Sequence, residues 1–372
     1  ILKIIHFSDT HLGFNDLDIL NSDGINQREV DFYKAFDDIV QSIIKIKPDY
    51  IIHTGDLFHR SSPSNRAIAF ALDKFAYLNS LNIPIILIAG NHSTPRTVTS
   101  KPILSIFDNF SNIYCAYSSK YETFEFDNIV FHTIPHLNEE SGIYNELDKL
   151  ESSINKYKKN IMMLHCSVGA SYLMSEFGEF VYPKDKEYIF EKMDYVALGH
   201  WHGFSKVGKY ENVFYSGSSE RTSLNDKRNN KGYILVNLNN SLEVNFKHIS
   251  IRPFYSFEID GNDFEKELSS IDKSNLNGAI IQVVINNLTA LKSIDISNHQ
   301  IKEYFTNCLQ VVVKREFIKE EDFKVDDIQA ISLKEYFTEF LEEYCAKDEY
   351  ERLKSKSDEL FAKYEESYDD IN

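Results

Sequence analysis

The stretch from Tyr50 to Arg60 constrains the fold more than any other part of the chain. It begins with an apolar run, Tyr50 to Ile52, that has the composition of a buried strand. The run breaks at Gly55, and glycine lets the backbone turn sharply so that the side chain of Asp56 projects from the carboxyl end of the strand. Open α/β sheets bind their ligands at that end. Taken alone, the stretch also fits a plain turn with a capping aspartate, so its meaning depends on the rest of the chain.

Four other apolar runs are followed by side chains that commonly bind metals. The runs lie at residues 3–8, 85–89, 161–164 and 195–198. Together with Asp56, the side chains that follow them make a set of seven candidate ligands: Asp9, His11, Asp56, Asn91, His165, His200 and His202. Imidazole mixed with oxygen donors suits Mn, Fe or Zn better than Ca or Mg. With one bridging carboxylate, seven ligands fit two ions about 3.5 to 4 Å apart, an arrangement suited to in-line displacement at phosphorus.

The order of these motifs resembles that of the calcineurin-like metallophosphoesterase superfamily. The chain carries D-x-H at Asp9, G-D at Gly55, G-N-H at Gly90, a lone histidine and then G-H-x-H at Gly199. Within the superfamily, the motifs G-D-L-F-H and Y-S-G-S-S-E-R, which begin at Gly55 and Tyr215, resemble the nuclease subunit of the SbcCD double-strand-break repair complex. That subunit is the bacterial counterpart of the meiotic-recombination-eleven nuclease of archaea and eukaryotes. The specific motifs cover about the first 250 residues, and the remainder is similar only in architecture.

The resemblance implies a fold and an activity. The fold is α/β, a two-sheet metallophosphoesterase sandwich flanked by helices, with a small α+β cap domain and a C-terminal helical pair. The activity is that of a Mn-dependent DNA nuclease, an exonuclease on double-stranded DNA and an endonuclease on single-stranded or hairpin DNA, which hydrolyses phosphodiesters by a two-metal mechanism. A phosphatase or cyclic-nucleotide phosphodiesterase would use the same site, and a weakly catalytic scaffold subunit is a third alternative.

The resemblance also implies roles for single residues. One Mn²⁺ ion would be held by Asp9, His11, Asp56 and His202, and the other by Asp56, Asn91, His165 and His200, with Asp56 as the bridge. His92 would act on the leaving oxygen as an acid or charge stabiliser, and His59 is the second expected catalytic residue. Two imidazoles near two cations cannot both be charged cheaply, so we expect the titrations of His59 and His92 to be coupled. Ser93 departs from the family pattern, which usually has Asp or Glu after G-N-H. Because serine brings no charge, we expect a weakened or retuned enzyme rather than an inactive one.

Contacts to DNA are expected from the Y-S-G-S-S-E-R stretch, where Ser218 and Ser219 offer donors to phosphate and Arg221 adds a positive charge. The net charge of −17 opposes nucleic-acid binding. Residues 332–372 hold thirteen acidic and six basic side chains, a net −7 that leaves −10 for residues 1–331. Two divalent ions would add positive charge at the place where the phosphate binds.

The hydrophobic pattern predicts alternating strands and helices over the first 250 residues. Helical spacing of apolar residues predicts helices over 27–45 and 65–79, and a shorter one over 102–110. The apolar side chains of the last two segments cover more than one face, so we expect them to form a homodimer interface, as the resemblance also implies. Short alternating runs over residues 113–134 suit the second sheet. Residues 169–182 lack clear periodicity and fit a lid, a DNA-contacting loop or a plain packed loop.

We divide the chain into a nuclease domain over residues 1–250, a cap or DNA-binding domain over 251–318, a linker over 319–331 and a helical pair over 332–372. The helical pair has two one-sided apolar stripes and too few residues for a core of its own. The resemblance implies that these helices bind the coiled coil of an SMC-like ATPase subunit. The alternative is that they fold back on the cap.

Nothing in the sequence points to a membrane or to secretion, because it has no run of about 18 apolar residues and no signal peptide. The cysteines Cys115, Cys166, Cys308 and Cys345 have no C-x-x-C spacing, which favours free thiols in a reducing compartment. We therefore expect a cytoplasmic, nucleoid-associated protein in a prokaryote, or a nuclear one in a eukaryote.

Overall fold

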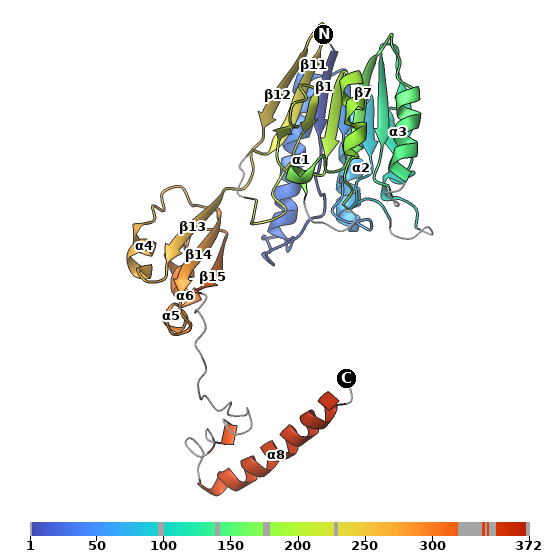
Figure 1. Cartoon of the computed structure of the whole chain (residues 1–372). Coiled ribbons are helices and arrows are strands. Elements are labelled where there is room, and N and C mark those ends of the chain that lie inside the picture. Colours follow the sequence, from blue (N-terminus) through green and yellow to red (C-terminus); the bar gives the residue numbers. More distant parts are fainter. Residues whose placement is uncertain are drawn as a thin grey trace. The chain divides into compact units, whose positions relative to one another are not determined.

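The computed structural model describes residues 2–95, 100–137, 142–173, 179–226, 230–318, 337–338, 341 and 347–369. The chain divides into two compact units, Ile1–Glu316 and Phe317–Asn372 (Figure 1). The domain boundaries expected near residues 250 and 331 stay predictions. The expected linker, 319–331, lies outside the described residues.

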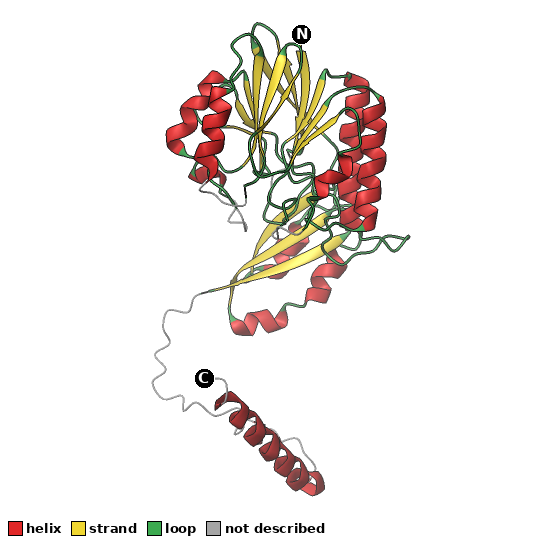
Figure 2. Cartoon of the chain, turned by 90° about the vertical axis from the view of Figure 1, so that its right-hand side faces the viewer, coloured by secondary structure: helices red, strands yellow, loops and turns green. Residues whose placement is uncertain are grey.

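Two six-stranded mixed sheets form the body of the first unit (Figure 2). The first sheet contains, in spatial order, β12 (Leu242–His248), β11 (Gly232–Leu238), β1 (Leu2–Phe7), β2 (Tyr50–His53), β3 (Ile85–Ile88) and β4 (Ile113–Ala116). The second contains β5 (Glu122–Glu125), β6 (Ile129–Ile134), β7 (Lys159–His165), β8 (Tyr195–Gly199), β10 (Val213–Tyr215) and β9 (Ser205–Lys206). The central strands of each sheet run parallel, so their carboxyl ends share one edge.

Three apolar layers hold the body together, and they explain why the central strands are continuous hydrophobic runs. The two sheets face each other across a core that includes Ile52, Ile88 and Met163. Helices α1 (Gln27–Ile46) and α2 (Asn65–Ser80) cover the outer face of the first sheet, where Phe36 and Phe75 are buried. Helix α3 (Ile143–Ser152) covers the second sheet, together with the 3-10 segment η4 (Lys184–Lys192). A short 3-10 turn, η3 (Ala170–Tyr172), follows β7.

Two elements differ from the expectation. The helix expected over 102–110 is only a short 3-10 turn, η1 (Ile103–Phe107), because Pro102 and the turn residues that begin at Asp108 leave room for little more than one turn. Its Phe107 packs against Phe75 of the same chain, with ring centroids 4.7 Å apart. Strand β4, expected in the second sheet, pairs with β3 at the edge of the first. A short alternating run suits either sheet, and the tertiary pairing decides between them.

The remainder of the first unit has a small sheet and a separate core. Strands β13 (Phe254–Asp260), β14 (Ile280–Leu288) and β15 (Gln310–Phe317) form the sheet, with helices α4 (Phe264–Ser270), α5 (Ala290–Asp295) and α6 (Asn298–Tyr304). The chain that enters this part is bonded to α1, because Nε and Nη2 of Arg252 each lie 2.5 Å from a carboxylate oxygen of Asp31. Asp31 also accepts a bond of 2.7 Å from Arg28.

In the second unit, the described residues form helix α8 (Lys347–Asp369) and a few positions before it. The ring centroid of Phe337 lies 6.2 Å from that of Phe361. The rest of the first helix of the expected pair lies outside the described residues, apart from Thr338 and Leu341. Among the helices that are described, none combines the length and apolar character needed to cross a membrane. Cys115, Cys166 and Cys308 are free thiols.

Candidate metal centre

Loops from both sheets bring the seven candidate ligands to the shared carboxyl edge of the parallel strands. The first sheet supplies Asp9 and His11 after β1, Asp56 after β2 and Asn91 after β3. The second supplies the other three ligands, from the end of β7 and from the loop after β8. Six of the seven side chains are buried, and Asn91 is half-buried. Strand direction therefore gathers side chains that lie up to about 190 residues apart in the sequence.

Asp9, His11 and His202 form a first group, in which one ligand atom of each lies within 4.8 Å of the others. Nε2 of His11 is 3.2 Å from Nε2 of His202, and this second nitrogen is 3.8 Å from Oδ1 of Asp9. Two ring nitrogens and a carboxylate that face one another form a typical binding site for a borderline divalent cation.

Asp9, Asp56 and His165 form a second group with the same spacing. Nε2 of His165 lies 3.1 Å from Oδ2 of Asp56 and 3.0 Å from Oδ1 of Asn91. The backbone N–H of His200 donates to both carboxylate oxygens of Asp9, at 3.2 and 3.1 Å. Asp9 thus belongs to both groups, and the role of Asp56 as the bridge stays a prediction.

The backbone at this edge adopts conformations that residues other than glycine rarely take. Four ligands have positive φ: Asp9 (51°), His11 (42°), Asp56 (54°) and His200 (92°). Such conformations cost about 1 to 3 kcal/mol each and persist where the surrounding structure demands them. At Gly55 φ is 104°, and a Cβ there would lie 2.1 Å from Nδ1 of His165. A Cβ at Gly90 would lie 2.3 Å from Oδ1 of Asp56, so both glycines are needed for the ligands to approach.

The electrostatics of the edge fit bound cations. Burial raises the pKa of Asp9 to about 7. Burial and the neighbouring His202 hold the pKa of His11 well below its usual value, so its ring is neutral and free to coordinate. Burial opposes ionisation of Asp56, but the facing His165 holds the pKa of that carboxyl well below its usual range. Burial likewise lowers the pKa of His165, yet the Asp56 carboxylate prevails and raises it to about 9. Divalent ions bound here would add positive charge beside these buried carboxylates.

His59 and His92 lie beside the first group. Nδ1 of His59 is 3.4 Å from Nδ1 of His11, and the rings of His59 and His92 stack with centroids 5.3 Å apart. Nδ1 of His92 donates to the backbone oxygen of His59 at 2.8 Å, since a carbonyl only accepts. The backbone N–H of His92 donates to Oδ1 of Asp56 at 2.9 Å. His11, His59 and His92 also have ligand atoms within 4.8 Å of one another, so His59 and His92 lie within reach of the same ion.

Ser93, the departure from the family pattern, is fully buried. Its hydroxyl has no hydrogen-bond partner among the described residues. The loop is held instead by the backbone N–H of Ser93 and the hydroxyl of Thr94, which both donate to the backbone oxygen of Gly90, at 3.3 and 2.8 Å. The loop that carries His92 therefore keeps its turn without an acidic residue at position 93.

The Y-S-G-S-S-E-R stretch, expected to contact DNA, is packed inside the protein. Ser218 and Ser219 are fully buried and Arg221 is 4% exposed. Arg221 donates to the backbone oxygens of Asp226 and Arg252, at 3.1 and 3.0 Å. The DNA contact of these three residues stays a prediction, and their burial does not favour it.

Two polar residues close to the ligands were not foreseen. Oε1 of Glu179 lies 3.3 Å from Nε2 of His200, and Oγ1 of Thr222 lies 2.9 Å from Nδ1 of His202. Glu179 belongs to the 169–182 segment, of which residues 174–178 lie outside the described part. Thr222 follows the Y-S-G-S-S-E-R stretch directly. For Glu179, the one available sign in the sequence was an acidic residue downstream of the strand that ends in His165. The sequence holds no comparable sign for Thr222.

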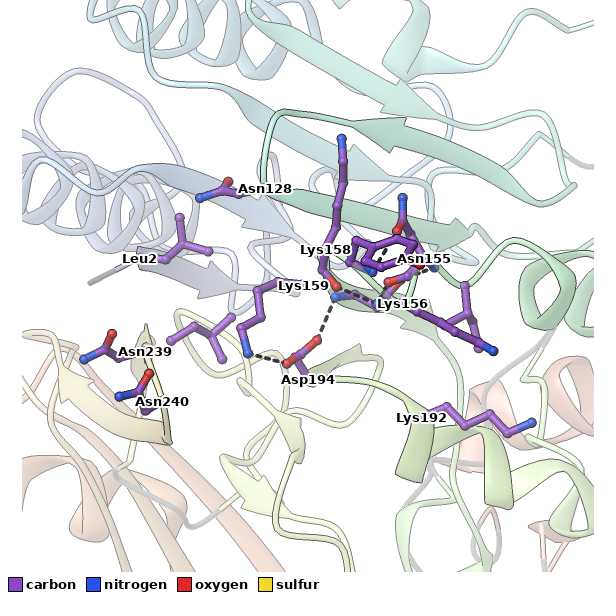
Figure 3. A pocket seen from close by; sticks show the side chains of 14 residues that line it. Leu2, Asn128, Asn155, Lys156, Lys158, Lys159, Lys192, Asp194, Asn239 and Asn240 are labelled. Atoms are coloured by element: carbon purple, nitrogen blue, oxygen red, sulfur yellow. Dashed lines mark hydrogen bonds and ion pairs between the residues drawn. The ribbon is translucent and has the colours of Figure 1, made fainter.

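A cavity of about 770 Å³ lies away from these ligands, at the amino ends of the parallel strands (Figure 3). Its lining includes Lys156, Lys158, Lys159 and Lys192 but no histidine, and Asp194 is its single carboxylate. That carboxylate pairs with Lys159 at 2.7 Å. The cavity therefore offers no set of metal ligands, and the candidate ligands lie at the opposite edge of the sheets.

Comparison with known proteins points the same way. Residues 2–204 match the family described as calcineurin-like phosphoesterase. The chain is 30% identical over 256 residues to the DNA double-strand break repair protein Mre11 of Methanococcus maripaludis, an alignment that covers 66% of this chain and 65% of that protein. It is 28% identical over 363 residues to the protein of the same name from Thermoplasma acidophilum, covering 91% and 89%. It is also 28% identical over 290 residues to a subunit of the nuclease SbcCD of Staphylococcus epidermidis, covering 71% and 73%. The chain spans slightly less than two thirds of the first relative and more of the other two.

Proposed function

The chain belongs to the calcineurin-like phosphoesterase family and, within it, to the Mre11 and SbcD group, and on this premise we propose that it is the nuclease subunit of a DNA double-strand-break repair complex. It cuts phosphodiesters from the ends of double-stranded DNA and within single-stranded or hairpin DNA. The observation that supports this most is that candidate ligands from both sheets meet at one buried edge, where Asp9, His11 and His202 form one group and Asp9, Asp56 and His165 another.

Two divalent ions fit this edge. Asp9, His11, Asp56 and His202 would hold one, and Asp56, Asn91, His165 and His200 the other. When bound, such ions polarise a phosphodiester and generate a nucleophile from water. Four imidazoles among seven ligands favour Mn²⁺ over Mg²⁺, because Mg²⁺ prefers oxygen donors and keeps several waters.

The chain's own residues prepare the chemistry in three ways. Positive φ at four ligands and the two glycines hold the donors in place before substrate binds. Burial of the ligands excludes bulk water and strengthens every interaction of charge at the site. The bond from Nδ1 of His92 to His59 leaves Nε2 of His92 as the atom that meets the leaving oxygen, so His92 gives up a proton from Nε2 only when its ring is doubly protonated.

We extend the proposal to partners and location. Residues 332–372 bind an SMC-like coiled-coil ATPase subunit, and the segments near 65–79 and 102–110 form a homodimer. The exposed Tyr77 on α2, with 48% of its surface accessible, would lie within that interface. The protein works where DNA is, in the nucleoid-containing cytoplasm of a prokaryote or in a nucleus.

End-labelled duplex, hairpin and single-stranded oligonucleotides test the function, each incubated with Mn²⁺, Mg²⁺ or EDTA. We expect Mn²⁺-dependent removal of nucleotides from duplex ends and internal cuts in the hairpin and single strand. Parallel assays with p-nitrophenyl phosphate and a cyclic nucleotide identify the alternatives. Rapid hydrolysis of either, with no cut DNA, would make the protein a phosphatase or a cyclic-nucleotide phosphodiesterase. Tight Mn²⁺ binding without hydrolysis of any substrate would make it a scaffold.

A further inference from the structure

We propose that Glu179 and Thr222 are positioning residues that determine how His200 and His202 face the metal ions. Glu179 holds His200 through Nε2 and leaves Nδ1 to the metal, and Thr222 holds His202 through Nδ1 and leaves Nε2 to the metal. The inference rests on the proposed function for the presence of the ions. It goes beyond it by naming the ligating nitrogen of each histidine and the residue that selects it.

His165 shows the pattern most clearly. Its Nδ1 lies 2.8 Å from the backbone oxygen of Thr54, which only accepts, so Nδ1 carries the proton. The other nitrogen, Nε2, faces Asp56 and Asn91 and would offer its lone pair to an ion that displaces the second proton. Metal-binding histidines usually donate their second ring N–H in this way, which orients the ring and raises its basicity.

His200 repeats the pattern with its ring reversed. Its Nε2 lies 3.3 Å from Oε1 of Glu179, and a carboxylate accepts, so the proton is on Nε2 and the lone pair is on Nδ1. The ring of His200 meets that of His165 edge-on, with centroids 5.3 Å apart. This contact places it beside the second ligand group.

Glu179 is held firmly enough to orient a ring. Its Oε1 accepts a bond of 2.7 Å from the hydroxyl of Ser167, and its side chain is 11% exposed. The residues that follow it pair with Ser167 as a short parallel bridge: Ser167 N–H donates to Phe180, and Tyr182 N–H donates to Ser167, both at 2.8 Å. Since Ser167 lies two residues beyond His165, one short segment after β7 supports ligands from two strands.

His202 is surrounded by the stretch around Y-S-G-S-S-E-R. Oγ1 of Thr222 lies 2.9 Å from its Nδ1, which turns Nε2 toward Nε2 of His11. The backbone oxygen of His202 accepts from the N–H of Ser218 at 3.2 Å and from the buried ammonium of Lys231 at 2.7 Å. The buried stretch would therefore orient His202 through hydrogen bonds on the side of the residue that faces away from the ion.

Mn²⁺ titrations of the full-length chain, followed by calorimetry and by the free-Mn²⁺ EPR signal, test the proposal with Glu179→Gln, Glu179→Ala and Thr222→Val. We expect each Glu179 variant to weaken one ion about 10- to 100-fold, and Thr222→Val to weaken the other. Glu179→Gln keeps the shape and an accepting oxygen, so it should lose less affinity than Glu179→Ala. Glu191→Gln, the same change at an exposed position, is the matched control and should bind as wild type does.

The Co²⁺-loaded protein provides a second readout that a merely structural role would not change. Each histidine bound through one nitrogen gives a shifted, exchangeable N–H proton signal from the other. We expect Glu179→Gln to move or broaden one such signal and Thr222→Val to alter a different one, with unchanged circular dichroism.

The outcomes separate this inference from the proposed function. If the wild-type protein binds two Mn²⁺ ions and cuts DNA while both Glu179 variants keep wild-type affinities and N–H signals, the positioning role is wrong and the function stands. Equal weakening of both ions by every variant, together with a lower melting temperature, would also overturn it, because that is the signature of general destabilisation. A wild-type protein that binds no Mn²⁺ defeats the proposed function and this inference with it.

Discussion

The candidate ligands at the carboxyl edge of the parallel strands have conformations and burial that lower the stability of the ion-free protein. Asp9, His11, Asp56 and His200 adopt positive φ, and Asp9 is fully buried with its pKa raised to about 7 by that burial. Strained backbone and a buried carboxylate both destabilise the ion-free fold. Such a combination is typical of a site whose ligand returns the lost stability.

Asp56→Asn tests the residue expected to bridge the ions. The amide is neutral, so one ion should be held poorly and the nuclease rate at saturating Mn²⁺ should fall below about a tenth of wild type. The rate on an end-labelled single strand and the Mn²⁺ stoichiometry give the answer, and Asp127→Asn, at an exposed turn, serves as the control. A variant that keeps more than that tenth would exclude Asp56 as the bridge.

His92→Ser separates chemistry from metal binding. The ring lies beside His59 and is bonded to its backbone, outside the set of seven ligands. Both ions should stay bound while the rate falls by about 100-fold or more, as expected when a general acid or charge stabiliser is removed. Loss of an ion in the titration would show that His92 is a ligand instead.

The buried histidine His6 predicts a pH dependence of stability. Its ring nitrogens lie 2.8 Å from the Tyr195 hydroxyl and 2.9 Å from the Thr54 hydroxyl, and burial lowers the pKa of His6 to about 3. The folded state therefore binds a proton at His6 only at a lower pH than the unfolded state does. The contribution is complete above about pH 6.5 and is lost as the pH falls toward 3, at no more than about 1.4 kcal/mol per pH unit.

Urea unfolding of His6→Gln between pH 7.5 and 5 checks this dependence. Glutamine keeps hydrogen-bonding groups but does not titrate, so the fall in unfolding free energy with acid should be shallower than in wild type. His248→Gln, at an exposed position, should leave the slope unchanged. An unchanged slope in His6→Gln would refute the assignment.

At the scale of elements, helix α2 packs against both the first sheet and helix α1. Ala67, Ala71, Phe75 and Leu78 bury one stripe against the first sheet, and Ser64 caps the helix by accepting from the N–H of Ala67. Phe70 lies off this stripe and stacks on Tyr33 of α1, with ring centroids 4.3 Å apart. The chain itself therefore covers much of the apolar surface on which the homodimer was predicted, and Tyr77 is the large hydrophobic side chain of α2 that stays exposed.

Tyr77→Glu tests the homodimer. A charge within the proposed contact should raise the dimer dissociation constant by about tenfold or more, measured by sedimentation equilibrium. The exposed Asp73→Asn on the same helix removes a charge instead and should leave the dimer intact. A wild-type protein that sediments as a monomer at all concentrations would rule out the interface.

At the scale of the whole molecule, the negative charge is uneven. Residues 332–372 hold −7 of the −17, so the acidic tail is better suited to a basic protein surface than to DNA. Helix α8 is amphipathic, and its described residues include a buried Ser357 and an exposed Leu360. A helix of this kind needs a partner for its apolar side, within the unit or outside it.

Deletion of residues 332–372 tests the tail. Mn²⁺-dependent cleavage of short single strands and the homodimer should persist, because the candidate ligands all lie in the first unit. Co-purification with the coiled-coil ATPase and ATP-dependent processing of duplex ends should be lost. A truncated chain that binds the ATPase with undiminished affinity in a pull-down titration would place the principal attachment elsewhere.

The sequence by itself determined the central strands, the helices α1 and α2 and the candidate ligands of this protein. Apolar runs that end in Asp, Asn or His are local patterns, and a parallel strand presents whatever follows it at one edge. The strands, and the metal-binding side chains that follow them, such as Asp56 and His165, could therefore be predicted from short stretches. The family resemblance rests on the same short stretches, and the match over residues 2–204 agrees with it.

Only the tertiary structure decided which residues surround those ligands. Glu179 lies 21 residues from His200 in sequence and Thr222 lies 20 from His202, and no periodicity relates them. Their meeting depends on how loops from neighbouring strands pack. The burial of Ser218 and Arg221 and the sheet that β4 joins were decided in the same way, because side-chain type states what a residue can bond to, while packing of the whole chain selects the partner.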